Sequence, residues 1–268
     1  MSLRGRVEGP ILVSMTDSAP TACILVIGNE ILSGRTKDTN SGWLAERLTA
    51  MGIRLREIRV IPDVEETIVA VVNETRAKYT YVFTSGGIGP THDDITAECI
   101  AKAFGVPWEI NPEARAILRS NYKSDDELTP ARLRMATLPR GAEMIPNPIS
   151  KAPGFRTGNV YTMAGVPRIL QAMFEGIASH LKGGPVLISH SVTGNMAEGL
   201  IGDALGEIQA RNPDLEIGSY PGQRPDGTFR NAVVIRGLDR ARLAAVAAEV
   251  AALIRSTGGE ATDEPPPA

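Results

Sequence analysis

Through residues 21–181, short continuous apolar runs alternate with stretches in which apolar residues recur at helical spacing. Short apolar runs at 22–27, 53–61, 79–84 and 160–164 predict strands. Apolar residues at helical spacing predict helices at 39–51, 94–104 and 167–181, and a further helix is expected to begin at Asp63. Because strands that alternate with helices form parallel sheets, we expect a mostly parallel sheet covered by helices on both faces.

The remaining segments are expected to form an excursion, a second domain and two tails. Residues 111–135 are helical in pattern but highly charged, which predicts an excursion over the sheet. After the glycine-rich linker at 182–185, residues 185–258 predict a smaller α+β domain of order β-α-β-β-α. Its strands are expected at 186–192, 216–220 and 230–235, and its helices at 196–210 and 240–256. Residues 1–20 and the proline-rich residues 259–268 are expected to be disordered.

Composition narrows the classes of protein. The chain has 268 residues, 43% of them hydrophobic, and a net charge of −3 without a basic block, which disfavours nucleic acid as a partner. No apolar run reaches membrane-spanning length, so no membrane association is expected. Cys23 and Cys99 lie far apart in apolar segments, which indicates buried free thiols and a cytoplasmic protein. The glycine motifs of nicotinamide enzymes and of standard ATPases are absent.

A glycine-rich segment follows the predicted strand at 79–84. It contains three glycines, a proline, two hydroxyl residues, two adjacent acids and a threonine at the expected helix start. These residues are Ser85, Gly86, Gly87, Gly89, Pro90, Thr91, Asp93, Asp94 and Thr96. We call residues 86–89 the glycine turn. Glycines there let backbone N–H groups approach a phosphate at a helix start, and adjacent carboxylates suit a divalent cation. The alternative is a tight turn in which Asp93 caps the helix and Asp94 favours its dipole. The density of these residues favours the anion site.

Three other loops are predicted at the same edge of the sheet, because the carboxyl ends of parallel strands meet there. The first carries Gly28, Asn29, Glu30, Ser33 and Gly34, followed by Asp38 and Asn40. Helix capping explains this loop equally well. The second holds Asp63, an N-cap by default, and the last contains Asn147, Gly154 and Gly165, with prolines typical of ordinary turns. Acids gathered at one edge repel one another unless a cation compensates them.

These motifs, with Leu138-Pro139, Asn147-Pro148 and Gly165-Val166-Pro167, resemble the MoaB/MogA molybdopterin-binding domain. Within that superfamily, residues 20–180 are most similar to the N-terminal domain of CinA, the competence/damage-inducible protein A, and to the related domain of eukaryotic FAD synthases. The resemblance implies a three-layer α/β/α domain that binds a pterin or nucleotide phosphate. It also implies that Asp63 and Asp94 are catalytic and that the glycine turn binds phosphate.

Two departures from the family pattern bear on function. Asn29 stands where the family usually has aspartate, which removes one potential metal charge, and Ala164 stands where a proline is usual. The resemblance does not extend to the C-terminal amidase domain of CinA, so that activity is not carried over.

Two functions are therefore expected as alternatives. The first is hydrolysis of nucleotide pyrophosphates of the ADP-ribose or FAD type, dependent on Mg, Mn or Co. Its metal ligands would be Glu30, Asp63, Asp93 and Asp94. The second is a non-catalytic module that binds molybdopterin or a nucleotide for molybdenum cofactor biosynthesis, which Asn29 favours. The resemblance also implies a homodimer or homotrimer.

Overall fold

The computed structural model describes residues 19–223 and 227–265. The chain divides into two compact units, one of them Ala19–Gly184 and the other formed by the described residues from Pro185 onward. The boundary falls in the glycine-rich linker. Most of the predicted N-terminal arm, residues 1–18, lies outside the described residues.

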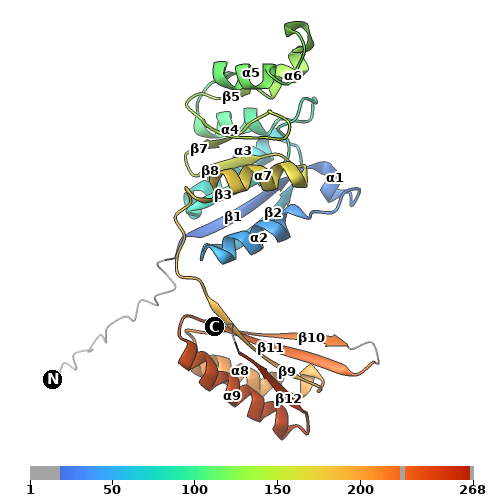
Figure 1. Cartoon of the computed structure of the whole chain (residues 1–268), viewed down its shortest axis with the longest axis vertical. Coiled ribbons are helices and arrows are strands. Elements are labelled where there is room, and N and C mark those ends of the chain that lie inside the picture. Colours follow the sequence, from blue (N-terminus) through green and yellow to red (C-terminus); the bar gives the residue numbers. More distant parts are fainter. Residues whose placement is uncertain (1–18, 224–226, 266–268) are drawn as a thin grey trace, which may run out of the picture. The chain divides into compact units, whose positions relative to one another are not determined.

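The first unit is built on a mostly parallel sheet (Figure 1). In the described residues this sheet has six strands in the order β2-β1-β3-β8-β7-β6. Neighbours from β2 to β8 are parallel, whereas β7 runs antiparallel to both β8 and β6. The strands are β1 (Thr21–Ile27), β2 (Arg54–Ile61), β3 (Tyr81–Ser85), β6 (Glu143–Ile145), β7 (Gly154–Thr157) and β8 (Val160–Met163). The sequence predicted β1, β2, β3 and β8 but neither β6 nor β7.

Helices cover both faces of this sheet. Residues of α3 (Glu65–Lys78) and α4 (Thr96–Phe104) pack on one face, and residues of α2 (Asn40–Ala50) and α7 (Pro167–Ala178) pack on the other. Strand β1 supplies alternate residues to the two cores, with Leu25 on the first face and Ile24 on the second. Burial on both faces is why β1 is a continuous apolar run. The expected three-layer α/β/α fold is confirmed.

The charged excursion contains several short elements in place of the expected helical stretch. We call residues 108–139 the side segment. It contains β4 (Trp108–Ile110), α5 (Pro112–Arg119), η2 (Asp125–Glu127), α6 (Pro130–Arg134) and β5 (Thr137–Pro139). Strands β4 and β5 pair as an antiparallel ladder. Asn111 caps α5, and Pro130 begins α6, so separate start signals divide the helical pattern.

The second unit is an antiparallel sheet covered by helices on one face. Its described strands have the order β10-β11-β9-β12, and the helices pack on Val192, Val233 and Ile235. The elements are β9 (Ile188–Gly194), η3 (Glu198–Leu200), α8 (Gly202–Arg211), β10 (Glu216–Gln223), β11 (Phe229–Gly237), α9 (Arg240–Ser256) and β12 (Ala261–Glu264). The expected smaller α+β domain is therefore present. Among the described residues, no helix combines the length and the apolar character needed to cross a membrane.

Strand β12 corrects the prediction of disorder for the described part of the 259–268 tail, while residues 266–268 lie outside the described residues. Residues 261–264 pair with β9, the Thr193 hydroxyl donates to Glu264 Oε1 (2.6 Å), and His190 Nε2 lies 2.6 Å from Asp263 Oδ1. The strand is mostly polar and exposed, so it lacks the apolar alternation by which strands are recognised. Nearby prolines pointed the interpretation toward disorder.

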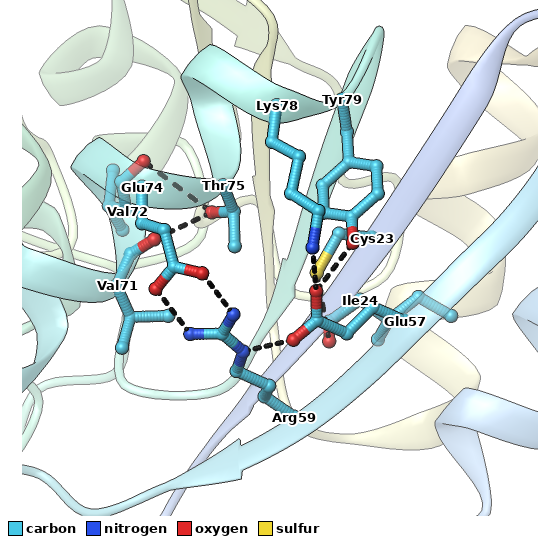
Figure 2. A network of polar contacts seen from close by, with 10 residues as sticks. All are labelled: Cys23, Ile24, Glu57, Arg59, Val71, Val72, Glu74, Thr75, Lys78 and Tyr79. Carbon is cyan, nitrogen blue, oxygen red and sulfur yellow. Dashed lines mark hydrogen bonds and ion pairs between the residues drawn. The ribbon is translucent and has the colours of Figure 1, made fainter.

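A polar network joins the edge strand β2 to α3. Figure 2 shows the Arg59 guanidinium between the carboxylates of Glu57 and Glu74. The Tyr79 hydroxyl donates to Glu57 Oε2 at 2.5 Å. These hydrogen bonds, from Arg59 first and then Tyr79, lower the pKa of Glu57 to about 2. On the neighbouring strand β1, Cys23 is paired with Glu57. Burial raises the pKa of this free thiol to about 12, so the cysteine stays protonated.

We expect Glu57→Gln to destabilise the protein by roughly 2 kcal/mol at pH 7, since it weakens hydrogen bonds to a charged group whose side chain is 22% exposed. The folded pKa lies below the ordinary value of 4.5, so the stabilisation is present above pH 4.5 and is lost as the pH falls toward 2. Urea unfolding should therefore show that the difference between wild type and variant falls by more than half between pH 7 and pH 3.

Glu46→Gln, an exposed substitution in the same unit, is the control and should show no such pH-dependent difference. A difference for Glu57→Gln that is equal at both pH values would contradict the role of the network.

Candidate functional site

A cavity of about 530 Å³ lies at the carboxyl ends of the parallel strands. Its walls come from the segments that follow β1, β3 and β8, together with the loop at 147–152 and one residue of the side segment. The lining residues are Glu30, Thr36, Gly86, Gly87, Ile88, Gly89, Pro90, Asp94, Met135, Asn147, Ser150, Ala152, Ala164, Gly165, Val166, Pro167 and Ile169. This is the edge at which ligands of open α/β sheets bind.

The glycine turn forms one wall of the cavity and requires glycine. Gly86 has a φ of +108°, and a Cβ atom there would lie 2.3 Å from the Ile27 carbonyl oxygen. A Cβ atom on Gly89 would lie 2.6 Å from Asp94 Oδ2. Backbone therefore reaches the cavity wall at a position where any side chain would clash.

The Asp94 carboxylate is held by Thr91, at the start of the turn that Asp94 ends. Its Oδ2 atom accepts the Thr91 N–H at 2.8 Å and the Thr91 hydroxyl. Helix α4 begins only at Thr96, with Ile95 as its N-cap, so the alternative in which Asp93 caps this helix is wrong. Asp93 does not line the cavity and its side chain is 61% exposed, and the neighbouring His92 is almost fully exposed.

Glu30 belongs to α1 (Asn29–Leu32), the short helix after β1, and lines the cavity. Asp63 does not line it. The Asp63 carboxylate accepts the Asn29 N–H at 2.8 Å and so ties the loop after β2 to α1. The expectation that Asp63 is an N-cap is wrong, because α3 begins at Glu65 with Val64 as its N-cap.

Asn40 joins three of the loops. Its side-chain amide donates to Ser85 Oγ (2.9 Å) and to the Gly165 carbonyl (2.8 Å), and the residue is only 6% exposed. Asp38 Oδ1 accepts the N–H groups of Asn40 and Ser41 at 3.0 Å each, which orders the first turn of α2. A smaller pocket of about 60 Å³ lies beside these residues and is also lined by Glu30 and Gly86.

The structure brings together part of the predicted set. Predicted residues that line the main cavity are Glu30, Gly86, Gly87, Gly89, Pro90, Asp94 and Gly165. Asn40 and Ser85 line the smaller pocket. Predicted residues that line neither are Gly28, Asn29, Ser33, Gly34, Asp63, Thr91, Asp93, Thr96 and Gly154. Gly154 lies in β7, where a Cβ atom would be 2.5 Å from the Thr162 carbonyl oxygen, so close strand packing explains that glycine.

Sequence reasoning missed much of the apolar wall, to which Met135, Val166 and Ile169 belong. The position of Val166 carried a signal, because it lies within a motif of the resemblance. Met135 carried none, since it ends a charged segment that was expected to lie outside the sheet.

The acids are separated in the structure. Among residues 19–223 and 227–265, no group of three or more His, Cys, Asp or Glu side chains is arranged to hold a metal ion. Glu30 and Asp94 are the acids on the cavity wall. Mg²⁺ commonly takes one or two carboxylates and completes its shell with water and substrate phosphates. This pair, beside a glycine turn that leaves room for an anion, fits that arrangement.

The fold and the cavity define an α/β protein with a cavity of about 530 Å³ at its strand ends. Residues 23–183 match the family described as the probable molybdopterin binding domain, and the chain belongs to that family. Residues 186–259 match the family described as FAD synthase, middle domain. The resemblance stated from the motifs is confirmed.

Relatives extend this finding. A protein of Pyrobaculum calidifontis is 40% identical over 212 residues, which are 75% of this chain and 81% of the relative. A CinA-like protein of Anaeromyxobacter dehalogenans is 42% identical over 149 residues, 54% of this chain but only 36% of that protein. The crystal structure of the protein CinA from Thermoplasma acidophilum is 35% identical with a TM-score of 0.58, and the match covers 60% of this chain and 98% of that one.

We expect Asn40→Ala to lower the free energy of unfolding by about 1–3 kcal/mol, because it removes two buried hydrogen bonds and leaves their acceptors without a donor. Asn73→Ala is the matched control, since Asn73 is exposed and its side chain contacts only the nearby Arg76. That change should cost less than about 0.5 kcal/mol in urea unfolding. Equal losses in the two variants would show that Asn40 does not hold the loops together.

Proposed function

We propose that this protein hydrolyses nucleotide pyrophosphates of the ADP-ribose or FAD type with the help of a divalent cation, Mg, Mn or Co. The observation that carries the proposal is the position of Glu30 and Asp94 on the same cavity as the glycine turn. Membership of the molybdopterin-binding family and the match of residues 186–259 to FAD synthase support a pterin or nucleotide phosphate as the ligand.

In this proposal the glycine turn binds phosphate through backbone N–H groups. The Gly86 N–H already donates to the Met163 carbonyl at 3.1 Å, so the amides of residues 87–89 would receive the anion. Glu30 and Asp94 would hold the cation between them and the phosphate. When bound, a divalent cation neutralises phosphate charge and lowers the pKa of a bound water molecule.

Residues around the carboxylates would orient them. Thr91 fixes one oxygen of Asp94, and Asp63 holds the backbone at Asn29, one residue before Glu30. Asp63 thus acts in the proposal by positioning α1, while its expected catalytic role stays a prediction. The apolar wall with Met135, Val166 and Ile169 would cover the ring of the ligand and exclude water from it.

The second candidate is a module that binds molybdopterin or a nucleotide without turnover. It is favoured by the small number of acids on the cavity and by Asn29 in place of the family's aspartate. Either function is proposed for a cytoplasmic homodimer or homotrimer.

Under the first proposal, Asp94→Asn and Glu30→Gln should each lower Mn²⁺-dependent hydrolysis of ADP-ribose and FAD by about 100-fold or more, because each removes a ligand charge from the cation. Chromatographic measurement of AMP release gives the rate. Glu46→Gln changes the same charge on the exposed face of α2 and should keep the wild-type rate.

The two candidates separate in native mass spectrometry. A wild-type protein that retains molybdopterin or ADP-ribose but releases no AMP with any of the three metals is a binding module. Full turnover by Asp94→Asn would refute the metal site proposed here.

A further inference from the structure

Arg134, the last residue of α6, connects the side segment to Asp94. Its Nη2 atom donates to the backbone carbonyl of Asp94 at 3.2 Å. The Cζ atom of the same guanidinium lies 5.2 Å from the centre of the Trp108 ring, a cation–π distance. The next residue, Met135, lines the cavity. The side segment therefore contacts the backbone of Asp94 through Arg134 and lines the cavity through Met135.

The platform for this contact is rigid. The Trp108 indole N–H donates to the Thr137 carbonyl at 2.9 Å, and Trp108 pairs with Pro139 in the β4–β5 ladder. The indole is thus held at both its ring and its backbone. Because the Arg134 guanidinium stacks on this indole, it has little freedom to follow movements of residues 91–94, which we call the Asp94 turn.

General packing of α6 does not explain the arrangement. Arg132 on the same helix makes the same kinds of contact, with its Cζ 4.5 Å from the Tyr122 ring and its Nη1 donating to the Glu127 carbonyl at 2.7 Å. Both partners of Arg132 belong to the side segment itself. Of this pair, Arg134 is the one that hydrogen-bonds outside the side segment, to Asp94.

Arginine also carries a cost at this position. The Nε atom of Arg134 is buried without a hydrogen-bond partner among the described residues. A buried donor without a partner costs free energy that an apolar side chain would avoid. The guanidinium is therefore unfavourable as packing material, which points to a role in its contact with Asp94.

The charges around the cavity give a second reason to assign Arg134 a role at Asp94. The described residues that line the cavity include the acids Glu30 and Asp94 but no lysine or arginine. Arg134 places a permanent positive charge at the backbone of Asp94, a residue of that cavity.

We infer that Arg134 is a positioning residue that sets the Asp94 turn, and that the side segment thereby controls where the Asp94 carboxylate lies in the cavity. The consequence for metal and phosphate rests on the function proposed above, whereas the positioning itself does not.

Hydrogen exchange of the full chain tests the positioning without any ligand. In Arg134→Met the amides of residues 91–96 should exchange about 10-fold faster than in wild type, because the anchor of the turn is gone. Arg132→Met, which removes the same type of contact on the same helix, should leave these amides unchanged. Equal exchange of residues 91–96 in wild type and Arg134→Met, or equal acceleration in both variants, would overturn the inference.

Titration with Mn²⁺ in the presence of ADP-ribose tests the consequence. In a Trp43→Phe background Trp108 is the only tryptophan, and its fluorescence reports binding independently of turnover. Arg134→Met should raise the half-saturating Mn²⁺ concentration about 10-fold, with a smaller change in the KM for ADP-ribose, and Arg134→Lys should recover part of the loss. Faster exchange at residues 91–96 together with an unchanged Mn²⁺ titration would uphold the positioning and refute Asp94 as a metal ligand.

Discussion

The candidate site depends on a close approach of backbone to backbone at the ends of three parallel strands. At Gly86 the chain passes so near the Ile27 carbonyl that no side chain fits, and a Cβ atom on Gly165 would lie 3.3 Å from the Gly86 Cα. The buried amide of Asn40 then joins the loops after β3 and β8. Because these contacts join segments from different strands, the shape of the cavity is set by the sheet.

This constraint also decides which acids can act together. The turn folds the Asp94 carboxylate back onto Thr91, and the loop after β1 carries Glu30 to the wall of the same cavity. Asp63 holds the backbone of α1, and the Asp93 side chain is 61% exposed and does not line the cavity. Two carboxylates on one cavity repel each other less than four would. In the function proposed above, two protein carboxylates leave the rest of the cation's shell to water and to the phosphate of the ligand.

The sequence predicted the parts of this arrangement that local patterns encode. Strand β1 was recognisable because burial on both faces requires a continuous apolar run, and the glycine turn because its backbone excludes other residues. Strands β6, β7 and β12 are short, and most of β12 is exposed, so they leave little periodic signal. The sequence also did not show which contacts each acidic side chain makes. Asp63 and Asp94 both come after strands, but a tertiary contact joins Asp63 to Asn29, whereas Thr91 in the same turn holds Asp94 at the cavity.

The side segment shows how far such contacts can change an interpretation. Its charges indicated a peripheral excursion, yet it supplies Met135 to the cavity wall and Arg134 to the back of the Asp94 turn. Most of the cavity wall therefore follows the strands of a deeply buried sheet, whereas Met135 comes from a charged addition held by a two-stranded ladder. The glycine turn tolerates little change, because a side chain at Gly86 would clash with the Ile27 carbonyl. The side segment has no such restriction, so under the proposed function substitutions there would alter the apolar wall and the placement of Asp94 while the backbone of the glycine turn stays intact.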